Sequence, residues 1–236
     1  MIEQRTVEWK QARLGFFTGS QIGKLMKSGR GKDKFFGDTA LSYIYDVASQ
    51  RNLKEVVVSN PDVWEMYDEQ TSSWSRAIQF GVDWEGEAKK KYSLASGNRV
   101  EEVGSVEHPS IPFFSASPDG MINEDGKLGV LEVKCPTPAV FMKYVSEIRD
   151  NASLKDVNPE YYYQTQAEMM VSGAFFCDFT VFNPFMKNPL HIIRILPEEE
   201  TFSEIENRVG KANDLIKHIL EYQNGISRKS NSRTSA

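Results

Sequence analysis

A predicted β-hairpin around the Asp-Gly pair at 125–126 constrains this chain more than any other part of its sequence. The pair lies between two apolar runs and favours a two-residue turn. In that register Asp119 lies directly opposite Glu132, and Ser117 lies opposite Lys134. Opposed residues have Cβ atoms about 4.5–5.5 Å apart, and alternation keeps these four side chains on one face. A longer turn would shift the register, so the inference depends on the turn type.

This polar patch has the groups that a hard divalent cation and phosphodiester hydrolysis require. Two carboxylates at that separation repel unless a cation lies between them, and oxygen ligands without sulfur favour Mg²⁺ or Mn²⁺ over Zn²⁺. Such a cation stabilises charge on the transition state and lowers the pKa of an attacking water. Lys134 can orient or deprotonate that water, or stabilise the developing charge. The alternative is a solvated hairpin face where the same side chains form surface ion pairs.

The neighbours of Glu132 favour the metal site. Val130, Leu131 and Val133 make the strand apolar on both sides of Glu132, so this carboxylate interrupts a strand that otherwise suits a buried sheet. A carboxylate on an exposed edge would not need such neighbours.

The composition is that of a soluble globular protein with room for one α/β domain. Apolar residues make up 40% and charged residues 26% of the 236 positions. No apolar run reaches the roughly 18 residues of a membrane span, and the polar N-terminus lacks a signal-peptide core, so we expect a cytoplasmic protein without a membrane partner. Two cysteines are too few for a disulfide framework or an iron–sulfur cluster. The net charge of −5 argues against a general basic coat for DNA, although the segment 24–34 is strongly basic.

The periodicity predicts one mixed sheet flanked by helices, in a single domain over residues 1–224. We expect helices over about 7–14, 18–27, 39–51, 73–95, 141–149, 158–171 and 198–222, and strands over 99–106, 112–122, 128–134, 175–182 and 190–196. Asn158 followed by Pro159, an N-cap before a first-turn proline, marks the start of the helix at 158. The Gly-rich segment 28–38 is expected to form a mobile basic arm. Residues 52–62 break the helical pattern, and residues 52–75 look like an insertion. The polar tail 225–236 is predicted to be disordered.

Four groups of residues together resemble the lambda exonuclease family. In order along the chain they are Arg13-Leu-Gly15 with Thr18-Gly-Ser20, Phe80-Gly81 with Trp84-Glu85, Ser117-Pro-Asp119 with Glu132-Val-Lys134, and Tyr161 with Gln164-Thr-Gln166. That family belongs to the restriction-endonuclease-like superfamily, whose signature is an Asp followed, after a short gap, by Glu-x-Lys. The resemblance covers residues 8–185 and implies a restriction-endonuclease-like α/β fold. The loop after Pro136 departs from the pattern, because it lacks an expected arginine.

The resemblance also implies roles for the site residues. The catalytic residues would be Glu85, Asp119, Glu132, Lys134 and Gln164, and the metal ligands would be Asp119, Glu132, Val133 and Glu85. From the residues alone, Glu85 is equally consistent with an ion pair to Lys89 one helical turn away. Gln164 is likewise consistent with an amide satisfied within helix packing, and Gln166 points elsewhere.

Two further sets of residues would bind DNA. By resemblance, the pocket for a 5′-phosphate would consist of Arg13, Ser20 and Ser117, and the alternative is a surface arginine beside a plain helix cap. The other DNA-binding candidates are Arg30, Lys32, Lys34 and Tyr161. Phe35 and Phe36 in the basic arm could wedge a DNA end open, or they could simply dock on the core.

The implied activity is Mg²⁺-dependent hydrolysis from the 5′ ends of linear duplex DNA, with Mn²⁺ as a possible substitute. The products would be mononucleotides and a 3′ single-stranded overhang for phage-type recombination in the cytoplasm of a bacterial host. The resemblance implies a single-strand annealing protein as partner and a ring-shaped homotrimer, for which 198–222 and 52–75 are candidate contact surfaces. The alternatives are another endonuclease or repair nuclease of the superfamily, and a catalytically dead DNA-binding module.

Overall fold

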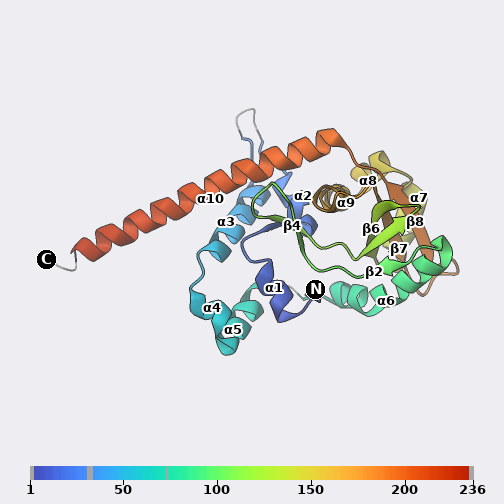
Figure 1. Ribbon diagram of the computed structural model, residues 1–236, viewed down its shortest axis with the longest axis horizontal. Helices are drawn as coiled ribbons and strands as arrows, with labels where there is room; N and C mark the ends of the chain where they lie inside the picture. Colours follow the sequence, from blue (N-terminus) through green and yellow to red (C-terminus); the bar gives the residue numbers. More distant parts are fainter. Residues whose placement is uncertain (1–2, 31–33, 73, 234–236) are drawn as a thin grey trace.

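A mixed five-stranded sheet lies in the part of the molecule farthest from the C-terminus (Figure 1). The computed structural model describes the backbone of residues 3–30, 34–72 and 74–233, with side chains as far as residue 225. In spatial order the strands are β2 (Val100–Glu101), β5 (Gly120–Glu124), β6 (Lys127–Lys134), β7 (Phe176–Phe182) and β8 (Leu190–Ile195). β6 and β7 are parallel, and the other neighbours are antiparallel. The parallel pair requires a crossover, which is helical here.

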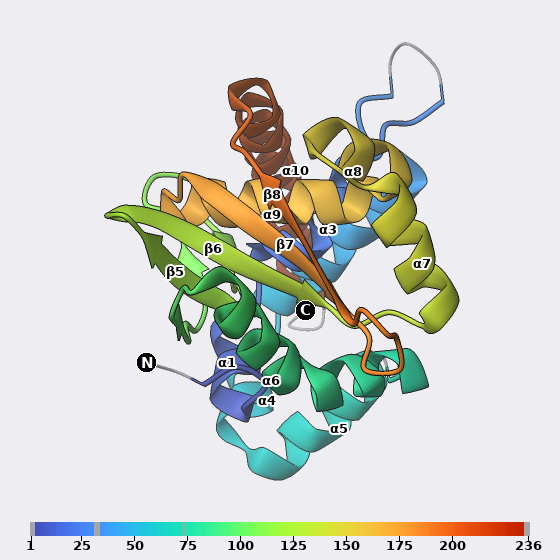
Figure 2. The same cartoon turned by 90° about the vertical axis from the view of Figure 1, so that its right-hand side faces the viewer.

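Helices cover both faces of this sheet (Figure 2). The crossover from β6 to β7 consists of α7 (Pro138–Glu147), α8 (Asn151–Val157) and α9 (Pro159–Ser172), and α6 (Arg76–Ser96) packs on the opposite face. Because side chains alternate along a strand, β6 sends Leu131 and Val133 toward α6 and Val130 toward the α7–α9 layer. The expected α/β sheet with helical layers is confirmed.

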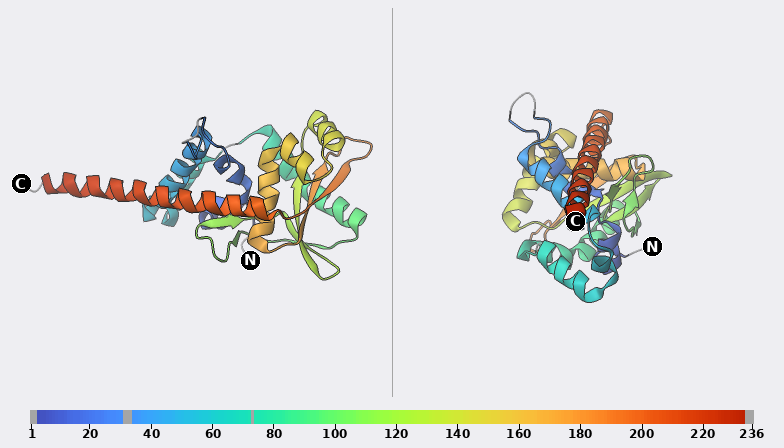
Figure 3. Two further views of the ribbon diagram at one scale, coloured as in Figure 1. Left: turned by 90° about the horizontal axis from the view of Figure 1, so that it is seen from above. Right: turned by 90° about the vertical axis from the view of Figure 1, so that its left-hand side faces the viewer.

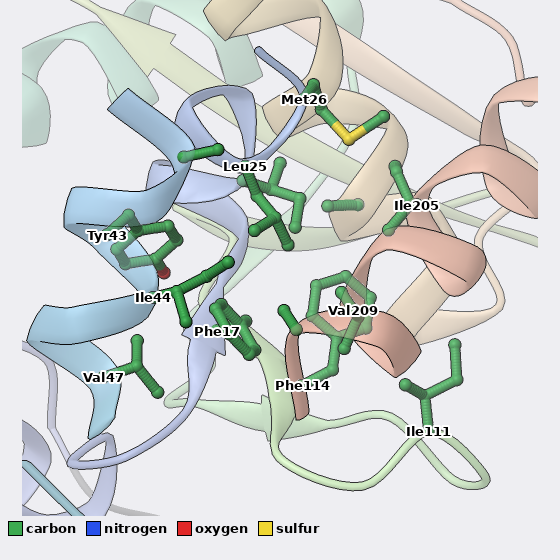
Figure 4. Close-up of a cluster of buried hydrophobic side chains, with 14 of the residues drawn as sticks. Phe17, Leu25, Met26, Tyr43, Ile44, Val47, Ile111, Phe114, Ile205 and Val209 are labelled. Atoms are coloured by element: carbon green, nitrogen blue, oxygen red, sulfur yellow. The ribbon is translucent and has the colours of Figure 1, made fainter. Parts of the chain in front are cut away.

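A second, smaller sheet lies beside the first and was not predicted. Its strands, in the order β1 (Phe17–Thr18), β4 (Phe114–Ala116) and β3 (Val106–Glu107), pack with the N-terminal and C-terminal helices. Figure 4 shows this core, where Phe17 and Phe114 meet Ile44 and Val209. The N-terminal helices are α1 (Val7–Ala12), α2 (Ile22–Leu25), which follows the 3-10 turn Gly19–Gln21, and α3 (Asp38–Arg51).

The strands predicted over 99–106 and 112–122 each divide between the two sheets. Residues 100–101 and 120–124 belong to the large sheet, whereas 106–107 and 114–116 belong to the small one. Pro118 lies at the second break, and proline has no N–H to donate to a ladder. The expectation of a single sheet was therefore wrong.

Residues 52–75 are largely helical rather than irregular. They contain α4 (Glu55–Ser59) and α5 (Pro61–Thr71). Asn60 caps α5, because its side chain accepts from the N–H groups of Asp62 and Val63, and Pro61 occupies the first turn. The same Asn-Pro signal was used to place the start of α9, where Asn158 accepts from the Tyr161 N–H. It was overlooked at position 60.

The C-terminal helix α10 (Glu199–Arg233) is longer than predicted and projects beyond the other elements (Figure 3). The expected disordered tail was wrong for residues 225–233, since the helix, once formed, extends by adding one hydrogen bond per residue. Residues 234–236 lie outside the described part of the chain. No helix in the described part is long and apolar enough to span a membrane.

Candidate active site

The hairpin has the register that its sequence predicts. Glu124 pairs with Lys127 and Gly120 with Leu131, so Asp119 follows next, opposite Glu132. Both turn residues have left-handed backbone, with φ of 51° at Asp125 and 82° at Gly126, as a two-residue turn of this type requires. The prediction from the Asp-Gly pair is confirmed.

Asp119 is half-buried beside two other carboxylates. Its Oδ2 accepts the Val133 N–H at 2.7 Å, which fixes the carboxylate against the end of β6. Burial, then the negative charges of Glu132 and Glu85, raise the pKa of Asp119 well above its ordinary value. Since a nearby cation would relieve this repulsion, the cluster is electrostatically suited to a metal ion.

Glu132 and Lys134 form an ion pair on the face of β6 that points toward α9. Glu132 is only 2% exposed, although it interrupts an apolar strand. Burial lowers the pKa of Lys134, but the adjacent Glu132 carboxylate raises it more, so Lys134 is an ammonium at neutral pH. The ammonium also lies 4.5 Å from the centre of the Tyr161 ring. The burial of Glu132 therefore excludes the alternative in which these side chains form surface ion pairs on a solvated face of the hairpin.

Gln164 brings α9 into the site. Its Nε2 donates to Glu132 Oε1 at 2.7 Å, and its Oε1 accepts from Lys134 Nζ at 3.2 Å. It also donates to Glu168 at 2.8 Å. Gln166 instead bonds the Leu196 carbonyl, so it points away as predicted.

Glu168 was missed by the sequence analysis. It is 1% exposed, and burial followed by the charge of Glu132 raises its pKa well above the ordinary value. Its position four residues after Gln164, on the same helical face, was the available signal. Glu168 thus joins the buried cluster around Glu132, because both carboxyl groups accept from the Gln164 amide.

Glu85 reaches the site from α6 but is neutralised by two cations. Lys89 Nζ lies 2.7 Å from one carboxylate oxygen, and Arg5 binds the other. Burial raises the pKa of Glu85, but the hydrogen bonds and charges of Lys89 and Arg5 outweigh it and hold the pKa below its ordinary value. The alternative ion pair with Lys89 is thus present, and Glu85 also lines the same cavity as Asp119.

The donor set suits a hard cation held by few protein ligands. Among the described residues, no three His, Cys, Asp or Glu side chains are grouped as a ready-made cage. Mg²⁺ nevertheless binds commonly through one or two carboxylates while retaining several waters. Asp119 and Glu132 could provide those two carboxylates, since the Oδ1 of Asp119 is not the oxygen that bonds Val133.

A cavity of about 540 Å³ joins these carboxylates to the predicted phosphate pocket. Arg13, Ser20 and Ser117 line it together with Asp119 and Lys134. The Arg13 guanidinium stacks 3.9 Å from the centre of the Trp9 ring and lies 3.4 Å from Ser20 Oγ.

Three residues that line this cavity each have a buried polar atom without a hydrogen-bond partner in the described part of the chain. The atoms are Trp9 Nε1, Arg13 Nε and Ser117 Oγ. Burial lowers the pKa of Arg13 to about 10, so the side chain remains cationic at neutral pH. Buried polar groups without partners are rare in native proteins, and a bound ligand, ion or water is one way to satisfy them.

Two DNA-binding candidates of the basic arm, Arg30 and Lys34, do not line this cavity. Arg30 and Lys34 are exposed, and Lys32 lies outside the described residues. The base of the arm is closed by a hydrogen bond from the Gly37 N–H to the Lys27 carbonyl. Phe35 packs under Lys211 of α10, 4.0 Å from the ring centre. Phe35 is thus exposed beside α10, whereas Phe36 packs against the core of the small sheet, as the second interpretation of the arm predicts.

The Asp119, Glu132 and Lys134 side chains at the end of a mixed sheet, between helical layers, are the arrangement expected of a restriction-endonuclease-like nuclease. The sequence profile of the YqaJ-like viral recombinase domain matches residues 8–175, and the chain belongs to this family.

Solved structures agree with this family. The alkaline exonuclease LHK-Exo from Laribacter hongkongensis is 26% identical, with a TM-score of 0.74 over 95% of this chain and 99% of that one. A structure of LHK-Exo in complex with dAMP matches with a TM-score of 0.73. A phage related exonuclease from Haemophilus somnus 129PT, 14% identical over 88% of this chain and 96% of its own, has a TM-score of 0.65 and supports the fold alone.

A curated relative extends beyond this chain. Uncharacterized protein R354 of Acanthamoeba polyphaga mimivirus is 28% identical over 115 residues, which is 44% of this chain and 20% of that protein. The chain thus matches about a fifth of that relative's length. Together, the family and the LHK-Exo structures support a DNA exonuclease role.

Proposed function

We propose that this protein is a Mg²⁺-dependent exodeoxyribonuclease that digests linear duplex DNA from its 5′ ends. The products are mononucleotides and a 3′ single-stranded overhang. The observation that carries the proposal is one cavity that contains both the Asp119–Glu132–Lys134 group and the unsatisfied donors of Arg13 and Ser117. A hydrolytic centre beside an anion site suits cleavage next to a terminal phosphate.

In this proposal the carboxylates bind the metal ion and the lysine acts on the water and the phosphate. Asp119 and Glu132 hold the cation, and Glu85 and the Val133 carbonyl are the further candidate ligands. Mg²⁺, for which Mn²⁺ substitutes, stabilises negative charge at the phosphate and activates the water when bound. Lys134 orients that water and adds positive charge close to the scissile phosphate.

Gln164, on α9, holds the side chains of Glu132 and Lys134 in fixed orientations, since it forms a hydrogen bond with each of them. The face of the Tyr161 ring stabilises the Lys134 ammonium through a cation–π contact. Positioning of this kind accelerates a reaction because the groups are already oriented before the substrate arrives.

The 5′ polarity follows from the phosphate pocket. Arg13, Ser20 and Ser117 bind the terminal 5′-phosphate with charge-assisted hydrogen bonds, which are about twice as strong as neutral ones. The next phosphodiester then lies toward the carboxylates. Arg30, Lys32 and Lys34 of the basic arm contact the backbone of the duplex.

The biological role proposed is phage-type recombination in the cytoplasm of a bacterial host. There the protein acts with a single-strand annealing protein that coats the exposed strand. We further propose a ring-shaped homotrimer around the DNA. Exposed apolar side chains on α5 and α10, such as Met66 and Tyr222, support these two helices as contact surfaces.

The test compares linear and closed-circular duplex, each with Mg²⁺ and with EDTA. We expect degradation of linear DNA only, in Mg²⁺ only, and release of label as mononucleotides from a 5′-labelled strand before a 3′-labelled one. Cleavage of circles would instead indicate an endonuclease. Binding without cleavage of either form would indicate a DNA-binding module.

A further inference from the structure

The N-terminal residues 3–6 form a strap across the edge of the active-site cavity. Gln4 Nε2 donates to the carbonyl of Val103 at 2.9 Å and to that of Pro118 at 2.8 Å. Thr6 Oγ1 donates to the Glu3 carbonyl at 2.8 Å and caps α1 by accepting the Trp9 N–H at 3.2 Å. Since Pro118 directly precedes Asp119, the strap is fixed to the segment that holds this carboxylate.

Arg5 has a strained backbone within this strap. Its φ is 70°, in the left-handed region that side chains other than glycine disfavour. Such a residue persists where surrounding contacts hold it, as Gln4 and Thr6 do on either side. Non-glycine residues in this region cluster at functional sites.

The Arg5 guanidinium lies in the active-site cavity. It lines that cavity together with Asp119 and Lys134, and it pairs with Glu85 Oε2. Its side chain is 47% exposed, compared with 13% for Glu85, so Arg5 can leave while Glu85 stays. Lys89 neutralises the other oxygen of Glu85 from a neighbouring cavity of about 440 Å³.

Both oxygens of Glu85 are therefore bound by cations of the protein itself. A divalent cation would have to replace one of them to use Glu85 as a ligand. Arg5 is the more exposed of the two, at 47% against 17% for Lys89. Once released, a guanidinium in this cavity has a fork of donors that matches a phosphate in a bidentate manner.

We propose that Arg5 is a phosphate-binding residue of this active site. In the free protein its guanidinium pairs with Glu85, and when a divalent cation displaces it from Glu85, it binds a phosphate of the DNA backbone. The proposal rests on the function proposed above. It assigns the strap two roles, since Arg5 neutralises Glu85 in the free protein and contacts a phosphate in the loaded complex.

The test measures Mn²⁺ affinity without DNA, by the loss of the free-ion EPR signal, and kcat and KM on linear duplex at saturating Mn²⁺. Arg5→Gly suits the φ of 70° and should fold with an unchanged or higher Tm. We expect it to bind Mn²⁺ up to about fivefold more tightly, the range of a part-exposed ion pair. We expect its kcat/KM to fall roughly tenfold or more, as for loss of a charged hydrogen bond.

Three companion variants separate the two roles. Arg5→Lys keeps the charge but not the fork, so Mn²⁺ affinity should stay near wild type while kcat/KM falls. Lys89→Ala removes the second cation that pairs with Glu85, so Mn²⁺ should bind more tightly while the KM for DNA does not rise. Lys90→Ala removes an exposed lysine of the same helix and should change neither measurement.

The outcomes distinguish this proposal from the proposed function. Mn²⁺ affinity that is unchanged or weaker in Arg5→Gly would overturn the role on Glu85. Tighter Mn²⁺ binding with unaltered kcat/KM would overturn the phosphate contact. Either result leaves the nuclease proposal standing, whereas wild-type protein that binds no Mn²⁺, or binds it equally after Asp119→Ala, would overturn both.

Discussion

Gln164 Nε2 lies 2.7 Å from Glu132 Oε1, so the crossover helix α9 is bonded directly to strand β6 near its carboxyl end. The contact is buried on both sides, since Glu132 is 2% and Gln164 7% exposed. A hydrogen bond to a charged group in such surroundings is stronger than one in water. The packing of α9 on the sheet therefore fixes the orientation of the proposed metal ligand.

Gln164→Leu should lower kcat at least about tenfold, because it leaves Glu132 and Glu168 without the amide that joins them. Steady-state rates on linear duplex at saturating Mg²⁺ measure the effect. Gln166→Leu is the matched control, since it removes a buried amide from the same helix but one that bonds Leu196. It should reduce thermal stability and leave kcat nearly unaltered. Equal losses of kcat in the two variants would contradict a specific role for Gln164.

Lys134→Ala and Asp119→Ala should each reduce hydrolysis by orders of magnitude while DNA binding survives. The reason is that both side chains act on the transition state rather than on the bound duplex. Single-turnover rates and a binding assay with the same DNA separate the two effects. Lys127→Ala, at the exposed start of β6, is the control and should keep full activity. Near-wild-type turnover of Lys134→Ala in Mg²⁺ would refute the proposed mechanism.

Arg13→Ala should remove the preference for a 5′-phosphorylated end. Wild-type protein is expected to digest such ends faster than 5′-hydroxyl ends, because Arg13 and Ser117 present unsatisfied donors to the phosphate. Initial rates on the two end types, for wild type and variant, give the comparison. Lys24→Ala removes an exposed charge from α2 and should preserve the preference. Equal wild-type rates on both ends would rule out the pocket.

Met66→Asp on α5 or Tyr222→Asp on α10 should dissociate the proposed trimer. These side chains are 71% and 74% exposed, and a charge in an apolar interface is costly. Sedimentation at micromolar concentration measures the assembly, and digestion of long duplex measures processivity. Leu94→Asp changes an equally exposed apolar residue on α6 and serves as the control. A wild-type monomer of 26.8 kDa that still digests processively would disprove the ring.

Asp178→Ala should destabilise the fold by about 1–3 kcal/mol without altering the chemistry of the site. Asp178 is 2% exposed and accepts from Tyr92 at 2.6 Å and from Arg194 at 2.9 Å, on the α6 face of the sheet, opposite the face that carries Glu132. Removing it leaves the buried Tyr92 hydroxyl without its acceptor. Urea denaturation measures the loss. Glu124→Ala, at the exposed end of the same network, should change stability little.

Local signals in the sequence were enough to predict the chemical centre. The Asp-Gly turn fixed the register of the hairpin, because turn type and two-residue alternation act over a few residues. That register alone brings Asp119, Glu132 and Lys134 together. The Asn-Pro cap placed the start of α9 for the same reason, and its repetition at Asn60 would have placed α5 too.

Only the tertiary structure decided which distant side chains meet this centre. The pairing of Glu85 with Arg5 joins positions 80 residues apart, and the contact of Gln164 with Glu132 spans 32. No periodicity encodes such distances, since they depend on how α6, α9 and the N-terminal strap pack against the sheet. The division of the strands between two sheets is likewise a result of packing. The sequence by itself thus determined the hairpin and its chemistry, whereas burial of the helices against both sheet faces decided how the remaining charges surround it.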